Sequence, residues 1–257
     1  ENHMSGMVAL SHIASRAVAY TKNLLPWTPR EGPPAHEQML LKLMRSSALS
    51  DVDAAVKIVE RGCFEGAAET SYEDLAKFYA LASAYGSAYA MNCLAYMSKH
   101  GIGVKQDDQG AVTLMKTAVD LGNTDAKNAL ALMYMQGRGL QRDDEKAVEL
   151  MKLAAEEGSV SALYNLGYFF DDISKDYEYA VHYYKAAASH GDADAMNNLG
   201  VLYYEGRGVP KDSNEATYLW ALAIREGSER ALGNVLEKYG TILTQTEPHE
   251  GVIATLH

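Results

Sequence analysis

Cysteine and long apolar runs are scarce in this chain of 257 residues, and each shortage excludes a class of protein. The two cysteines, Cys63 and Cys93, are too few and too far apart for a disulfide framework or a zinc cluster. No stretch of about 18 apolar residues is present, so we expect no helix that spans a membrane. Since no secretory signal peptide is evident either, the composition favours a reducing compartment and a cytoplasmic location.

Positive charge is also in short supply. Lys plus Arg number 23 against 34 Asp plus Glu, which gives a formal net charge of −11 at pH 7. Because binding to a phosphate backbone needs a basic surface, this balance excludes nucleic acid as the main partner. The acidic surface is typical of a solvated exterior, and it leaves open a basic protein as a partner.

The sequence offers no set of residues that would carry catalysis. None of the eight histidines belongs to a His-Glu-x-x-His motif, and His182 and His190 lack a third metal ligand. Cys63 has no base partner that the sequence identifies, and the adjacent Asp171 and Asp172 are expected in a solvated loop. Neither Gly-x-Ser-x-Gly nor a phosphate-binding loop occurs. We therefore expect a protein that is not an enzyme and that binds neither a metal nor a cofactor.

What the chain does contain is an internal repeat. Five glycines recur at spacings of 33 or 36 residues, and each has an alanine four residues before it and another four residues after it. Agreement at three positions around five glycines is far outside chance. The glycines are Gly86, Gly122, Gly158, Gly191 and Gly227, and the units between them are 87–122, 123–158, 159–191 and 192–227.

Each unit predicts two helices joined by a loop. In the first helix, apolar or small side chains fall at offsets 0, 4 and 8 from the repeat alanine, which places them on one helical face. A Gly-x-Gly loop follows in three of the units, and its first glycine can end the helix in the left-handed conformation. Acidic residues then suit the N-cap and the dipole of the second helix. The loops lie at 101–103, 137–139 and 206–208, and the acidic residues are Asp107, Asp143 and Asp212.

Two further glycines, Gly167 and Gly200, lie inside the first-helix pattern. Glycine costs about 1 kcal/mol relative to alanine in a helix interior. We expect a close approach of two helices to explain both positions.

The pattern of the last unit resembles the Sel-one-like repeat (SLR), a relative of the tetratricopeptide repeat with a slightly longer loop. The resemblance rests on Ala195, Leu199, Gly200, Tyr203 and the Gly206-Arg-Gly loop, and it covers residues 87–227. It implies an all-α, right-handed α-solenoid of helix-turn-helix repeats. The unit at 159–191 departs from the family pattern, because its loop at 171–176 is three residues shorter and lacks both glycines. The shape of that loop stays open.

The ends of the chain are less regular. Residues 1–34 predict an N-terminal helix followed by a proline-rich linker, and 35–86 predict degenerate helical repeats. The acid-free composition of residues 4–30 is weakly similar to an organelle-targeting peptide, but an ordinary first helix is favoured. Residues 228–257 predict a capping helix and a tail. Apolar residues of the N-terminal helix also allow a homo-oligomer.

The resemblance implies that the first helices line a concave groove that binds a protein or peptide. Offsets of 2, 6 and 9 from the repeat alanine form a second stripe on these helices, away from the packing stripe. Asparagine and tyrosine there suit hydrogen bonding and apolar contact with a partner, although aromatic residues at this spacing are also common in helix cores. The candidate contact residues are Asn92, Tyr96, Asn128, Leu132, Met135, Tyr164, Tyr168, Asn197, Val201 and Tyr204, and Lys99 and Asp171 lie in the same stripe.

The sequence therefore predicts a non-catalytic interaction scaffold. Proteins of the resembled family include bacterial adaptors and immunity proteins that neutralise a toxin, and the acidic composition suits a basic toxin. Two alternatives remain open. One is a hydrolase that acts on a cell-wall or antibiotic-like ligand. The other is a structural protein that self-associates through its N-terminal helices.

Overall fold

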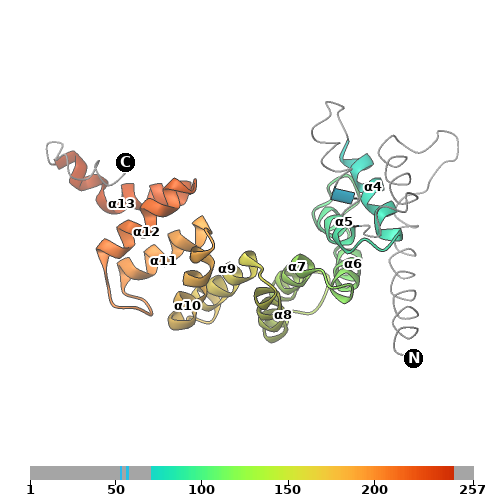
Figure 1. Cartoon of the computed structure of the whole chain (residues 1–257), viewed down its shortest axis with the longest axis horizontal. Coiled ribbons are helices and arrows are strands. Elements are labelled where there is room, and N and C mark those ends of the chain that lie inside the picture. Colours follow the sequence, from blue (N-terminus) through green and yellow to red (C-terminus); the bar gives the residue numbers. More distant parts are fainter. Residues whose placement is uncertain (1–52, 54–55, 58–70, 246–257) are drawn as a thin grey trace. The chain divides into compact units, whose positions relative to one another are not determined.

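The computed structural model describes Asp53, Val56, Lys57 and residues 71–245. This part of the chain contains α-helices and one π-helical turn, with no strand among the described residues. The predicted N-terminal helix, most of 35–70 and the tail at 246–257 lie outside it. The elements are α4 (Tyr72–Ala84), α5 (Ala88–His100), α6 (Asp108–Asp120), α7 (Thr124–Gln136), α8 (Asp144–Glu156), α9 (Val160–Tyr168), η1 (Phe169–Ile173), α10 (Tyr177–Ser189), α11 (Ala193–Glu205), α12 (Ser213–Arg225) and α13 (Glu229–Gln245) (Figure 1).

The chain divides into two compact units, Glu1–Leu150 and Met151–His257. In the first unit, each helix from α4 to α7 packs against the next one along the chain. The second unit continues this pattern from α9 to α13, and α11 also contacts both α9 and α13. The first helices of successive repeats therefore lie side by side in the second unit.

Helix ends follow the sequence signals closely. Gly101, Gly137 and Gly206 are left-handed C-caps of α5, α7 and α11. The aspartates predicted as N-caps accept hydrogen bonds from backbone amides, and Asp107 and Asp212 are examples at α6 and α12. Because a helix leaves its terminal amides and carbonyls without partners, these caps define where each helix begins and ends.

The second glycine of each Gly-x-Gly loop touches the preceding repeat. A Cβ on Gly208 would overlap the carbonyl group of Tyr177, at the start of α10. Gly103 and Gly139 have the same relation to the starts of α4 and α6. The loop thus lies directly on the backbone of the previous second helix, and only glycine fits there.

The two mid-helix glycines also have the predicted explanation. A Cβ on Gly200 would lie 2.6 Å from Nε1 of Trp220, and a Cβ on Gly167 would lie 2.5 Å from Cδ1 of Tyr184. Both aromatic side chains are wholly buried. The prediction of close helix approach is confirmed, and the approaching group is an aromatic ring.

The third repeat differs from the expected loop. Instead of a solvated loop, residues Phe169–Ile173 continue α9 as a π-helical turn, which ends at Ser174. Asp171 within this turn is half-buried, whereas Asp172 is exposed. The missing Gly-x-Gly pair explains the difference, because no glycine is present to end the helix after α9.

Candidate protein-interaction surface

The stripe predicted on the first helices is unevenly exposed in the first unit. Tyr96 is 55% exposed and its ring lies 4.5 Å from the ring of His100, one turn further along α5. Asn92 on the same helix is half-buried. On α7, Asn128 is buried, and the side chains of Leu132 and Met135 are half-buried. Tyr96 is therefore the most accessible member of the stripe in this unit.

In the second unit, Tyr168 is the accessible member. Its side chain is 43% exposed, and its hydroxyl donates a hydrogen bond to Oδ2 of Asp172 at 3.0 Å. That hydrogen bond raises the pKa of Tyr168, with a smaller contribution from burial. Lys175 holds Asp172 from the other side, with Nζ 3.3 Å from Oδ1. The tyrosine hydroxyl is thus fixed while part of the ring faces solvent.

Asn197 lies in the stripe but is 4% exposed and holds helices together. Its Oδ1 accepts a hydrogen bond from Nδ2 of Asn234 on α13 at 2.7 Å, and its Nδ2 donates to Oδ1 of Asn198 at 3.2 Å. Its backbone oxygen accepts from Nε1 of Trp220 on α12 at 3.1 Å. These bonds join α11 to both following helices, so the Asn197 side chain is engaged inside the protein.

Tyr204 is surrounded by other side chains. Its ring lies 5.7 Å from Trp220 and 6.3 Å from Tyr239, and the ammonium groups of Lys211 and Lys238 lie 5.2 and 5.8 Å from its centroid. Such contacts are attractive because the π-face of the ring is negative. Tyr204 is half-buried within this cluster.

A polar group beside Tyr164 extends across the three adjacent first helices. Tyr164 is half-buried on α9, and burial raises its pKa, followed by the charge of Asp194. Asp194 on α11 pairs with Arg230 on α13, with 3.6 Å between Oδ1 and Nη1. Both charged side chains remain more than half exposed. The remaining stripe residue of α11, Val201, is half-buried.

Sequence reasoning did not find the role of the arginine between the two loop glycines. Arg207 lies 3.1 Å from Asp171 and 2.6 Å from Glu205, and its guanidinium lies 5.0 Å from the ring of Tyr177. Burial raises the pKa of Asp171, and the charge of Arg207 opposes that rise. The side chain thus connects α11 to both elements of the preceding repeat.

Arg138 has the same role one Gly-Arg-Gly loop earlier. Its Nη2 donates to the backbone oxygen of Lys99 at 2.6 Å, and its Nε lies 2.9 Å from Oδ1 of Asp108. Burial lowers the pKa of Lys99, and the charge of Arg138 lowers it further. The signal in the sequence was the recurrence of arginine in two of the three Gly-x-Gly loops.

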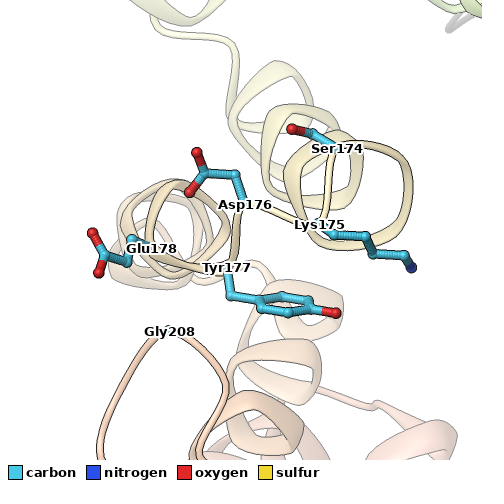
Figure 2. Close-up of a pocket in the computed structure, with 6 residues that line it drawn as sticks. All are labelled: Ser174, Lys175, Asp176, Tyr177, Glu178 and Gly208. Atoms are coloured by element: carbon cyan, nitrogen blue, oxygen red, sulfur yellow. The ribbon is translucent and has the colours of Figure 1, made fainter.

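A shallow, open hollow of about 490 Å³ lies beside the start of α10. Figure 2 shows that Lys175 and Tyr177 extend to one side of it, whereas the carboxylates of Asp176 and Glu178 lie on the other side. These groups diverge, so they do not form the converging nucleophile and base that a catalytic site requires. The lining is completed by Ser174 and Gly208.

A family model for the Sel1 repeat matches residues 88–123, 124–159, 160–192 and 193–228, which together make up more than half of the chain. The chain belongs to the Sel1 repeat family. The matched units begin one residue later than those read from the glycine spacing. No curated protein matches the chain.

Solved structures support the same assignment for the fold of this Sel1 repeat protein. A Sel1 repeat protein from Oxalobacter formigenes is 26% identical, with a TM-score of 0.70 over 84% of this chain and 89% of that chain. The protective antigen c5321 of uropathogenic Escherichia coli, which displays an SLR fold, is 25% identical, with a TM-score of 0.61 over 76% of this chain and 43% of that one. Immunity protein PA5088 from Pseudomonas aeruginosa shares the fold at 22% identity, with a TM-score of 0.52 over 71% of this chain and 69% of its own.

The family assignment confirms the predicted all-α repeat fold and has a coarse functional consequence. Sel1 repeats typically mediate protein–protein interactions. Within the described residues, no helix of this Sel1 repeat protein is long and apolar enough to cross a membrane. The same residues contain no group of three or more His, Cys, Asp or Glu side chains that could hold a metal ion.

Proposed function

We propose that this Sel1 repeat protein is a non-catalytic scaffold that holds a segment of another protein on the exposed side of its first helices. The observation that carries the proposal is the exposure of Tyr96 and Tyr168, which occupy the same repeat position on α5 and α9. Tyrosine is enriched in protein interfaces because its ring offers apolar area and its hydroxyl a hydrogen bond. Because the two tyrosines occupy the same position in their repeats, each unit offers the same kind of contact.

Polar groups beside Tyr164, one turn before Tyr168 on α9, support contact with a polypeptide. Asp194 and Arg230 form an exposed pair at 3.6 Å on the neighbouring helices. Since exposed pairs contribute about 0–1 kcal/mol, a partner can separate them at little cost and bind either charge. Asn128 and Asn197 are buried, and Asn197 also joins α11 to α13, so the contact itself is assigned to the accessible tyrosines.

Charge supports a basic partner. The net charge of −11 favours association with a basic surface, mainly through a faster encounter. Neutralisation of a basic toxin is a specific form of this proposal, and it rests on charge alone because the likeness to immunity protein PA5088 concerns the fold. The groups that line the hollow beside the start of α10 diverge, so this hollow gives no support to the hydrolase alternative. Self-association through residues 1–34 stays a prediction, because those residues lie outside the described part.

A paired affinity purification tests the proposal. The wild-type chain, a Tyr96→Ala/Tyr168→Ala variant and a Tyr218→Ala control are used to capture proteins from the native cell. Tyr218 is 58% exposed on the second helix α12, so the control removes an equally exposed tyrosine elsewhere. We expect one partner that the wild type and the control retain and the double variant loses. Equal recovery with all three baits would contradict the assignment of the first helices, and turnover of a peptide or cell-wall substrate would contradict the non-catalytic assignment.

A further inference from the structure

The third repeat carries an aromatic stack that the other repeats lack. Its π-helical turn places Phe170 against α10, where the ring stacks on Tyr183 at 5.6 Å with an interplanar angle of 10°. The other neighbour is Tyr179, 5.1 Å away at 27°. Tyr179 is 53% exposed, so a large part of its ring faces solvent at the outer end of the stack.

The corresponding ring in two other repeats is covered by a lysine. Phe170 lies eight residues after its repeat alanine, as do Tyr134 and Tyr203. The ammonium of Lys146 lies 5.2 Å from the ring centroid of Tyr134, and that of Lys185 lies 5.3 Å from Tyr203. Each ring thus has a cation from its own chain within the range of cation–π attraction.

In the third repeat, Tyr179 occupies the position that Lys146 has in the second, whereas the first and fourth repeats have Gly110 and Glu215 there. Lys146 is the third residue of α8, and Tyr179 is the third residue of α10. The substitution changes the group on the ring from an ammonium to a second aromatic face, which is itself exposed. Among the described residues, no cation lies over the Tyr179 ring.

The charges around Tyr179 are negative or already engaged. The neighbouring Glu178 is exposed, and no described residue forms an ion pair with its carboxylate. The nearby Lys175 pairs with Asp172 at 3.3 Å, and Lys185, further along α10, lies over Tyr203. Figure 2 shows the Glu178 carboxylate directed away from Lys175. A cation that approaches the Tyr179 ring from outside therefore displaces no cation of the described residues, and the exposed carboxylate of Glu178 adds negative charge to the same first turn of α10.

We propose that the exposed ring of Tyr179 forms a second interaction surface, which receives an arginine or lysine side chain of a basic protein partner. The partner's cation would lie on Tyr179, one ring further out than the position of Lys146, which lies on Tyr134 in the second repeat. Cation–π attraction to the Tyr179 ring supplies the contact, and the apolar part of the incoming side chain lies on the ring. This surface uses none of the stripe residues on the first helices, so it stands whether or not those residues bind a partner.

Binding of a fluorescently labelled octa-arginine peptide to the full chain tests this proposal. Fluorescence anisotropy at fixed ionic strength gives Kd for the wild type, Tyr179→Leu, Tyr179→Phe and Tyr179→Lys. Leucine keeps the apolar area but removes the π-face, and we expect it to weaken binding about two- to fivefold. Phenylalanine should keep wild-type affinity. Tyr179→Lys should weaken binding more than Tyr179→Leu, because the new ammonium group repels the peptide and lies over the Phe170 ring.

Tyr218→Leu is the matched control, because it removes another exposed tyrosine from a second helix. Circular dichroism melts establish that every variant is folded. The absence of peptide binding to the wild type would overturn the proposal, as would equal affinities for wild type and Tyr179→Leu. An equal loss in Tyr218→Leu would also overturn it, because binding would then reflect net charge. A loss of octa-arginine binding in the Tyr96→Ala/Tyr168→Ala variant but not in Tyr179→Leu would place the peptide on the first helices and would overturn this proposal without contradicting the first-helix scaffold.

Discussion

Replacing Gly200 with alanine tests why α11 tolerates a glycine in its middle. A Cβ at this position would lie 2.6 Å from Nε1 and 2.8 Å from Cδ1 of the Trp220 ring. Trp220 is wholly buried, and its Nε1 donates a hydrogen bond to the backbone oxygen of Asn197 at 3.1 Å. The ring therefore cannot move aside without losing this hydrogen bond and disturbing the packing around it.

Three contributions set the size of the effect. Helix propensity favours alanine over glycine by about 1 kcal/mol. Overpacking of a filled core costs about 1–3 kcal/mol, and loss of the indole hydrogen bond costs about 1 kcal/mol more. We expect Gly200→Ala to lower the free energy of unfolding by about 1–3 kcal/mol, which urea titration followed by far-UV circular dichroism measures.

The repeat itself supplies a compensating change. The position of Gly200 is occupied by Ala95 in the first repeat, and the register position of Trp220 is occupied there by Met115. Trp220→Met alone should cost about 2 kcal/mol through lost packing. In the Gly200→Ala/Trp220→Met variant, the methionine relieves the clash with the new Cβ. The decrease in the free energy of unfolding of this double variant should therefore be smaller than the sum of the two single decreases by about 1–2 kcal/mol.

Gly233→Ala is the matched control for this experiment. Gly233 lies in α13, and a Cβ there would meet nothing within 4 Å. This substitution should raise the free energy of unfolding by about 0.5–1 kcal/mol, because only helix propensity changes. A Gly200→Ala variant as stable as the wild type, or strictly additive losses in the double variant, would refute the explanation based on the indole ring.

Two further predictions concern Gly208 and the buried Tyr184. Gly208→Ala should destabilise the second unit by more than about 2 kcal/mol. The φ angle of Gly208 is +69°, and a Cβ there would overlap the carbonyl group of Tyr177. Thermal melts of the variant and the wild type measure this loss of stability. Burial raises the pKa of Tyr184 above its ordinary value of 10.0, so the folded state keeps a proton that the unfolded chain releases above pH 10.0. The stabilisation that comes from keeping Tyr184 protonated is complete below pH 10.0 and declines as the pH rises further. Urea titrations between pH 9 and about 11 should show a steeper decline for the wild type than for Tyr184→Phe, and equal slopes would contradict the assignment.

Helix ends were predictable because their causes are local. A glycine with positive φ at Gly101, Gly137 and Gly206 ends a helix wherever the rest of the fold lies. The aspartate caps depend only on amides two or three residues further along the chain, as Asp212 shows with Asn214 and Glu215. Spacing between such signals therefore predicted the repeat and the fold class.

The contact surface was harder to predict because exposure depends on the next repeat. Asn197 and Tyr168 both belong to the predicted stripe, yet one is buried and the other is 43% exposed. Asn197 is covered because Asn234, 37 residues further along the chain, reaches its side chain. Periodicity identifies the face of a helix but does not say whether a neighbouring helix covers it.

Arg207 shows the same limit for ion pairs. The Gly-Arg-Gly loop was identified as a helix end, but its arginine contacts Asp171, which lies 36 residues earlier. Since a repeat of this length places equivalent positions beside one another, pairs at a spacing of one repeat are the first contacts to examine in such a sequence. A search at a spacing of 36 residues would have found this pair, whereas the bond between Arg138 and Lys99 spans 39 residues and would not have been found.

The third repeat shows how a single departure from a repeat pattern changes several contacts together. The loss of three loop residues removes the glycine that would end α9, so the helix continues through η1 and carries Phe170 onto α10. A lysine at the third position of α10 would then have covered the Phe170 ring, as Lys146 covers Tyr134 in the second repeat. Tyr179 in that position instead extends the aromatic surface outward. Because the shared positions of a repeat maintain stacking between units, the positions that depart from the pattern are free to distinguish one family member from another. The shortened loop and the π-helical turn are departures of this kind, and they place Phe170 against the exposed Tyr179.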